Sequence, residues 1–110
     1  MNALKNRVQL IGHVGQDPEI KNLDGGKKVA NFTIATNDSY KNENGEKVEQ
    51  TEWHKVVAWG KTAEIIEKYV TKGKEIAIEG KLTHRSYDDK NGEKRYITEV
   101  VANDVLLLGK

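Results

Sequence analysis

TAEIIEKYVTK, residues 62–72, is the one stretch whose apolar residues recur at helical spacing, and it decides how the rest of the chain is interpreted. Ala63, Ile66 and Val70 form the apolar stripe. Thr62 is a candidate N-cap, and Gly73 stands where a helix-ending glycine belongs. The sequence therefore predicts a single α-helix over 62–72.

Strand-like segments flank this helix, three before it and two after it. They are rich in Val, Ile, Thr and aromatic residues, which favour strands. Their ranges are 4–14, 28–37, 48–59, 74–87 and 94–108. Asp-Gly and Asn-Gly pairs between them are strong hairpin signals. Several segments are longer than a usual strand, and Gly12 and Gly80 are candidate bends.

Three strands, one helix and two strands is the element order of the OB-fold. We therefore predict an all-β, five-stranded Greek-key OB-fold barrel with its helix between strands three and four. Other small β-barrels fit the same order of elements. At 110 residues the chain has the length of one domain, so we expect residues 1–110 to form a single barrel.

Composition excludes several classes of protein. The chain has no cysteine, which excludes disulfides and thiolate chemistry. No apolar segment has the length of a membrane span and the N-terminus lacks a signal-peptide core, so we expect a cytoplasmic protein. The 18 Lys plus Arg against 17 Asp plus Glu give a net charge of +1. A polyanion partner would thus depend on where the cations lie, because their number is balanced.

Alternation along TEWHKVVAWGK, residues 51–61, places Trp53, Lys55 and Trp59 on one face of a strand. A lysine between two tryptophans favours an outer face, since an unpaired buried ammonium is costly. The segment before the second Asn-Gly repeats the combination, with Arg85 and Tyr87 on one face. Aromatic rings with interleaved cations are typical of surfaces that bind single-stranded nucleic acid. The alternative is that both tryptophans fill the core while Lys55 extends to solvent.

Five segments, in order and covering nearly the whole chain, resemble the bacterial single-stranded DNA-binding protein family. They are RVQLIGHVGQDPE, VANFTIATND, TEWHKVVAWGKTAE, YVTKGKEIAIEGKL and RYITEVVAN. The resemblance implies an OB-fold that assembles into a homotetramer. It also implies a nucleoid-associated protein that wraps single-stranded DNA without sequence preference in replication, recombination and repair, with no cofactor, metal or catalysis.

The resemblance also implies roles for individual residues. The stacking aromatics would be Tyr40, Trp53, Trp59 and Tyr87, and the phosphate contacts Lys55, Lys61, Lys72 and Arg85. His54 would lie near a subunit contact. Phe32, Tyr69 and Tyr96 are interpreted as structural residues.

Many family members continue into a flexible linker with an acidic tip that recruits replication and repair proteins. This sequence stops at LLLGK, without such a tail, so recruitment of those proteins by a tail has no support in it. Either the sequence was cut at the domain boundary or it is a short, tail-less form.

Three other functions fit parts of the sequence. A primosomal replication protein, an OB-fold that acts mainly through protein partners, is the nearest, although four matched aromatic positions argue against it. An enzyme is disfavoured, because His13, His54 and His84 are too widely spaced for a common metal motif, and Asp88 and Asp89 have the pattern of turn residues. An RNA-binding barrel of cold-shock type remains open, since stacking does not distinguish RNA from DNA.

Overall fold

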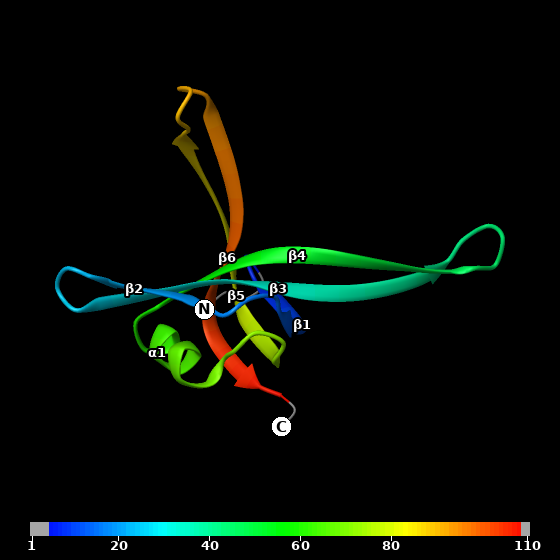
Figure 1. The fold of residues 1–110 in the computed structure, drawn as a ribbon, viewed down its shortest axis with the longest axis horizontal. Coiled ribbons are helices and arrows are strands. Elements are labelled where there is room, and N and C mark those ends of the chain that lie inside the picture. Colours follow the sequence, from blue (N-terminus) through cyan, green and yellow to red (C-terminus); the bar gives the residue numbers. More distant parts are fainter. Residues whose placement is uncertain (1–4, 109–110) are drawn as a thin grey trace.

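The computed structural model, which describes residues 5–108, is a small barrel from which two long hairpins project (Figure 1). Its elements, in chain order, are β1 (Val8–Val14), β2 (Glu19–Leu23), β3 (Lys27–Lys41), β4 (Lys47–Trp59), α1 (Gly60–Tyr69), β5 (Glu75–Asp88) and β6 (Lys94–Leu107). Leu4, the first residue of the predicted N-terminal strand of residues 4–14, lies outside the described residues.

Five strands close the barrel. The sheet order is β1-β5-β6-β4-β3-β2, and β1 also pairs with β3 through His13 and Val14. All pairings are antiparallel except that of β4 with β6, where Val57 lies beside Val101. Strand β2 pairs only with β3 and extends the sheet beyond the ring. The predicted all-β OB-fold class is thus confirmed.

The order of elements differs from the prediction in one detail. The helix follows the fourth strand, because the short β2 was not predicted. β2 has five residues, of which only Ile20 is not fully exposed, and so short a segment shows no readable alternation.

The bounds of the helix were also predicted wrongly. It begins at Gly60, and Trp59 occupies the N-cap position without a side-chain hydrogen bond. Thr62 is therefore inside the helix, where its hydroxyl donates to the carbonyl of Asn103 at 3.4 Å. Gly73 has a φ of +87° but lies beyond the helix end, in the turn to β5, and its N–H donates to the carbonyl of Val14.

The core fills the barrel and is closed at one end by α1. Ala63, Ile66 and Val70, the predicted stripe, are all buried against it, and Phe32 is buried inside as expected. The structural interpretation of Tyr69 and Tyr96 is wrong, since these side chains are 55% and 74% exposed. Tyr69 is left outside the core because Ala63, Ile66 and Val70 already fill the end of the barrel beneath the helix. Tyr96 lies on a part of β6 that no other layer of structure covers.

Glycines allow two close approaches between strands. A Cβ on Gly80 would lie 2.0 Å from the carbonyl oxygen of Val101, and one on Gly12 would lie 2.2 Å from that of Ala35. The β5–β6 register shifts between Glu79 and Gly80. The bend predicted at Gly80 is therefore present as a β-bulge, and both sites exclude any larger residue.

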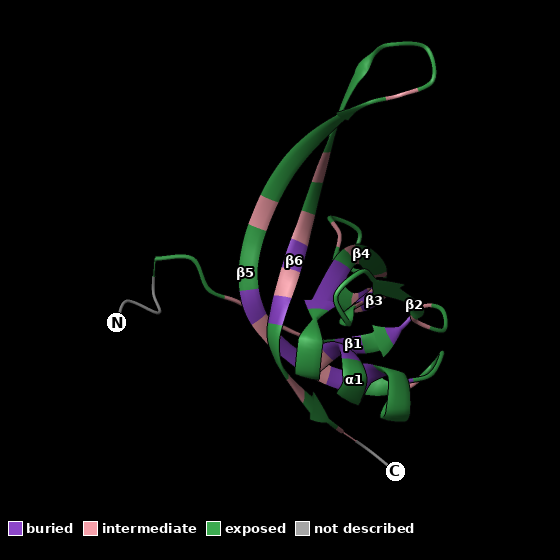
Figure 2. Ribbon diagram, turned by 90° about the vertical axis from the view of Figure 1, so that its left-hand side faces the viewer, coloured by how far each residue is buried: buried purple, intermediate pink, exposed green. Residues whose placement is uncertain are grey.

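Two hairpins extend past the barrel, and nearly all of their residues are exposed, as Figure 2 shows for the β5–β6 hairpin. The β3–β4 arm comprises residues 37–51 and the β5–β6 arm residues 84–98. Neither arm packs on a second layer of structure, so their strands depend on pairing with each other. These arms and the barrel surface between them carry most of the residues selected from the sequence.

Candidate nucleic-acid interface

The central part of the candidate interface lies where β4, β5 and β6 meet on the outside of the barrel. Lys55 and Arg85 line one groove of about 400 Å³, together with Ile97 and Glu99. A neighbouring hollow of about 350 Å³ is lined by Trp53 and shares Lys55, Ile97 and Glu99 with that groove. Trp53, Lys55, Arg85 and Tyr87 are called the stacking face below.

The ring of Trp53 lies against a glycine, Gly15. A Cβ on Gly15 would approach Cζ3 of Trp53 to 2.4 Å and the hydroxyl of Thr33 to 2.7 Å. The N–H of Gly15 donates to the carbonyl of Thr33, which fixes the backbone beneath the ring. The indole is nevertheless 62% exposed. One side of the ring is thus supported while most of its surface stays open to a stacking partner.

Arg85 is held on its strand by an ion pair. Its Nε donates to Oε1 of Glu99 at 2.9 Å, and the Glu99 side chain is only 11% exposed while that of Arg85 is 57% exposed. A guanidinium has further N–H donors besides Nε. Arg85 is therefore oriented by Glu99 and retains donors that face solvent.

Tyr87 continues the stacking face along the β5–β6 arm. It has the same strand parity as Arg85 and lies opposite Arg95 on β6. Its side chain is 45% exposed. Arg85 and Tyr87, which alternation placed on one face of their strand, therefore share a face in the structure.

Tyr40 lies apart from this group. It is 50% exposed and lies on the β3–β4 arm opposite Val48, whereas Trp53 lies opposite Ala35. By alternation Tyr40 and Trp53 have opposite parity on the same ribbon. The structure thus separates Tyr40 from the stacking face, along the arm and on its other side.

Trp59, Lys61 and Lys72 lie around the helix, away from the arms. Trp59 ends β4 and is 48% exposed, and Lys61 is exposed in the first turn of α1. Lys72 lies in the turn that follows the helix, where its backbone N–H donates to Oδ1 of Asp17 at 2.8 Å. The predicted contacts therefore form a central group and two outlying groups.

His54 faces away from Trp53, as its parity requires. It is half-buried, and its Nε2 lies 2.9 Å from the hydroxyl of Thr36.

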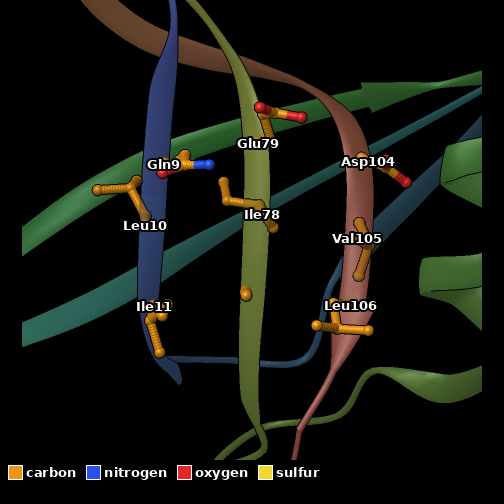
Figure 3. Close-up of a pocket in the computed structure, with 9 residues that line it drawn as sticks. Gln9, Leu10, Ile11, Ile78, Glu79, Asp104, Val105 and Leu106 are labelled. Atoms are coloured by element: carbon orange, nitrogen blue, oxygen red, sulfur yellow. The ribbon is translucent and has the colours of Figure 1, made fainter.

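A second surface lies on the outside of β1, β5 and β6 (Figure 3). Ile11, Ala77 and Leu106 lie side by side in the strand register, and Ile11 and Leu106 are 62% and 63% exposed. Over residues 8–12, β1 pairs with β5 and has no other strand beside it in the described part of the chain. An exposed apolar row beside an open strand edge is typical of a contact surface.

Sequence reasoning missed Gly15 and Glu99. Gly15 lies just after the predicted strand of residues 4–14, and its contact with Trp53 joins residues 38 positions apart in the sequence. Along β6, Glu99 has the same parity as exposed residues, so alternation alone indicates a solvent-exposed carboxylate. Only the pairing of β5 with β6 places it beside Arg85. The one signal that could have revealed Glu99 from the sequence is an excess of acidic residues with the parity of the predicted cationic face.

Among residues 5–108 no group of histidine and acidic side chains has the arrangement of a metal site. No helix in that range is long and apolar enough to cross a membrane.

Known proteins share both the sequence and the fold. The model of the single-strand binding protein family matches residues 5–108. The chain belongs to this family. A single-stranded DNA-binding protein 1 from Chlorobaculum tepidum is 50% identical over 105 residues, which cover 94% of this chain and 65% of that protein. Among solved structures, a Plasmodium falciparum SSB complex with ssDNA superimposes with a TM-score of 0.88 at 35% identity, covering 94% of this chain and 95% of the other.

Membership of the single-strand binding protein family confirms the resemblance inferred from the five sequence segments. It also agrees with the barrel topology, since the Plasmodium protein shares the fold over nearly the whole of both chains.

Proposed function

We propose that this chain binds single-stranded DNA without sequence preference and protects it during replication, recombination and repair. The observation that carries the proposal is the exposed Trp53 ring, supported by Gly15, on a face shared with Lys55 and Arg85. Family membership and the likeness to a complex with single-stranded DNA support it. The binding needs no bond to form or break, so we propose a non-catalytic protein without a cofactor.

Base stacking and phosphate contacts would make separate contributions to the binding free energy. Each base stacked on an aromatic ring contributes about 1 to 3 kcal/mol, and every base offers a π-face, so the sequence is not read. Lys55 and the outward donors of Arg85 would contact phosphates between stacked bases. Because Glu99 already orients Arg85, less side-chain entropy is lost when a phosphate binds.

The outlying residues would extend the path of the strand. Tyr40 would stack a base on the β3–β4 arm, and Trp59 with Lys61 and Lys72 would bind a further segment near the helix. Because the stacking face, the β3–β4 arm and the residues near the helix are separate parts of the surface, we propose that the strand wraps around the protein.

A binding assay with matched oligomers tests the proposal. Labelled dT, dA and mixed-sequence strands of equal length are titrated at two salt concentrations, with a ribose strand and duplex DNA as competitors. We expect similar affinity for all deoxyribose strands, weaker binding of duplex, and a loss of affinity at high salt. Absence of binding at low salt would refute the function and favour a role through protein partners. Preference for the ribose strand would instead indicate an RNA-binding protein.

We also propose that one barrel domain per chain assembles into a homo-oligomer, a tetramer by likeness to the family. The open edge of β1 and the exposed row of Ile11 and Leu106 support this proposal, because strand pairing and sheet packing would cover both. His54 is proposed to lie near a subunit contact. Sedimentation equilibrium would show four times the chain mass for the wild type and a smaller mass for Ile11→Asp or Leu106→Asp. A monomer in the wild type would refute the assembly.

A further inference from the structure

The two arms end in nearly the same sequence. SYKNENGEK, residues 39–47, and SYDDKNGEK, residues 86–94, share Ser, Tyr, Asn, Gly, Glu and Lys, six of nine positions. In each case the strands leave a loop of five residues, 42–46 and 89–93, which is called the tip below. The two tips lie at the ends of different arms, which project from the barrel in different directions (Figure 1).

The tips also share their hydrogen bonds, atom for atom. In the first tip, Oδ1 of Asn42 accepts the N–H groups of Asn44 at 2.9 Å and Glu46 at 3.0 Å. The Asn42 N–H donates to the carbonyl of Glu46, and the Gly45 N–H donates to the carbonyl of Asn42.

In the second tip, Oδ1 of Asp89 accepts the N–H groups of Asn91 and Glu93, both at 2.9 Å. The Asp89 N–H donates to the carbonyl of Glu93, and the Gly92 N–H donates to the carbonyl of Asp89. The glycines have the same left-handed backbone, with φ of +78° at Gly45 and +79° at Gly92. One Asx side chain thus closes each tip in the same way.

A tyrosine stands two residues before the Asx residue in both arms. The tip brings Tyr40 opposite Val48 and Tyr87 opposite Arg95. A slip of one residue in such a pairing turns every side chain to the other face of the strand. The arms have no core side to oppose a slip, because nearly all of their residues are exposed. Cross-strand bonds such as that of Arg85 with Glu99 act nearer the barrel, so the tip is the local feature that fixes the register at the free end of each arm.

We propose that Asn42 and Asp89 are positioning residues, each of which sets the register of its arm and thereby the face on which Tyr40 or Tyr87 meets single-stranded DNA. The inference rests on the proposed DNA binding. It makes the two tips equivalent modules, each presenting one ring to one base.

Matched variants of the β5–β6 arm test the proposal by titration with labelled oligo-dT. We expect Asp89→Ala to lose about as much affinity as Tyr87→Ala, within the roughly 5- to 150-fold range of one stacked base. The double variant should bind no more weakly than either single variant. Asp89→Asn should keep wild-type affinity, because an asparagine closes the other tip with the same bonds. Asp88→Ala is the charge control, since it removes a neighbouring carboxylate without touching these bonds, and it should not weaken binding.

The same variants in the β3–β4 arm provide a second test. Asn42→Ala should match Tyr40→Ala in affinity, and Asn42→Asp should be tolerated. Wild-type affinity of Asp89→Ala and Asn42→Ala, alongside weakened tyrosine variants, would overturn the proposal. Losses that multiply in the double variants would do the same.

Cross-strand NMR contacts separate this inference from the proposed function. In the wild type we expect contacts between Tyr87 and Arg95, which Asp89→Ala should shift or abolish. Retained contacts in Asp89→Ala would overturn the positioning role, whether or not the wild type binds DNA. A wild type that shows these contacts and loses them in Asp89→Ala, but binds no oligo-dT, would place the failure in the proposed function.

Discussion

The β3–β4 arm and the β5–β6 arm differ in the groups that hold their strands together. In the β5–β6 arm and at its base there are two ion pairs with N–O distances of 2.9 Å. Arg85 with Glu99 links β5 to β6, and Arg95 with Asp89 links β6 to the tip. In the β3–β4 arm the shortest side-chain bond between strands joins two neutral groups, Thr51 and Asn37, at 2.7 Å. Among residues 5–108, the one ion pair of that arm joins Lys47 to Glu49, both on β4, with an N–O distance of 4.0 Å.

The same difference appears inside the tips. Asn42 closes its tip as a neutral amide, while Asp89 uses its second oxygen to accept from Nε of Arg95. The Arg95 guanidinium, with the N–H groups of Glu93 and Asn91, holds the pKa of Asp89 below its usual value. The two tips thus share one loop geometry, but Asn42 closes its tip as a neutral amide whereas Asp89 also forms an ion pair with Arg95. The tip geometry therefore depends on an oxygen acceptor, and the charge of Asp89 adds sensitivity to pH and salt.

The largest effect is expected where the β3–β4 arm joins the barrel, at Trp53. Trp53→Ala should weaken oligo-dT binding by about 1 to 3 kcal/mol, because one stacking surface is lost. Its ring is mostly exposed, so the thermal midpoint should change little. Titration and thermal melting of the same sample check both statements. A variant that unfolds would restore the interpretation of Trp53 as a core residue.

Gly15→Ala offers a sharper form of that test. The new methyl group would meet the Trp53 ring and the Thr33 hydroxyl, so the ring must move although the tryptophan is still present. We expect a loss of affinity approaching that of Trp53→Ala. Unchanged affinity would show that the support under the ring is dispensable.

The two tyrosines should behave differently in combination with Trp53. Tyr87→Ala and Tyr40→Ala should each cost about 1 kcal/mol, the low end for one stacked base. Tyr87 shares the stacking face with Trp53, so its loss should be non-additive with Trp53→Ala. Tyr40 lies on the other side of its arm, so its loss should add to that of Trp53→Ala. Double-mutant cycles measured with oligo-dT decide this, and equal coupling for both tyrosines would erase the distinction between the arms.

Smaller effects are expected in the salt dependence of binding. Lys55→Ala and Arg85→Ala should each reduce the slope of log affinity against log salt by about 0.7, the value for one phosphate contact on a single strand. Lys41→Ala, a charge control on the β3–β4 arm outside the predicted contacts, should leave the slope nearly unchanged. The affinities are measured at four or more salt concentrations. A slope unaffected by Arg85→Ala would mean that its guanidinium serves only Glu99.

The smallest effect concerns pH. Asp89 has a lowered pKa in the folded protein, so its ion pair stabilises the tip at any pH above the usual Asp value of about 3.9. That stabilisation is lost as the pH falls through the lower, folded-state pKa. The protection of the Glu93 amide against exchange, relative to the intrinsic rate at each pH, should therefore fall in acid more than that of the Glu46 amide, whose acceptor is Asn42. An equal loss of protection in the two tips, or no difference between the wild type and Asp89→Asn, would contradict this expectation.

Features with a short sequence period were predictable from the sequence. The stripe of Ala63, Ile66 and Val70 predicted the buried side of the helix, and alternation placed Lys55 and Trp53 on the outside. β2 escaped prediction because five residues with one partly buried side chain have no readable period.

Contacts between distant segments were not predictable. The pairing of Arg85 with Glu99 and the contact of Trp53 with Gly15 depend on how strands pair and how the barrel closes. Tyr69 and Tyr96 were assigned wrongly for the same reason, since their exposure depends on which surfaces remain uncovered. The twin tips were visible in the sequence, but their equivalence is established by the matching hydrogen bonds.

The central claim, that the open face of Trp53 binds bases, is tested most directly in a Trp59→Phe variant, in which Trp53 is the sole tryptophan. Its fluorescence is followed during titration with long oligo-dT at low salt. We expect strong quenching that saturates at a fixed number of nucleotides per chain and reverses when salt is added. Binding of the oligomer without any change in Trp53 fluorescence would contradict it, because the strand would then pass elsewhere on the protein.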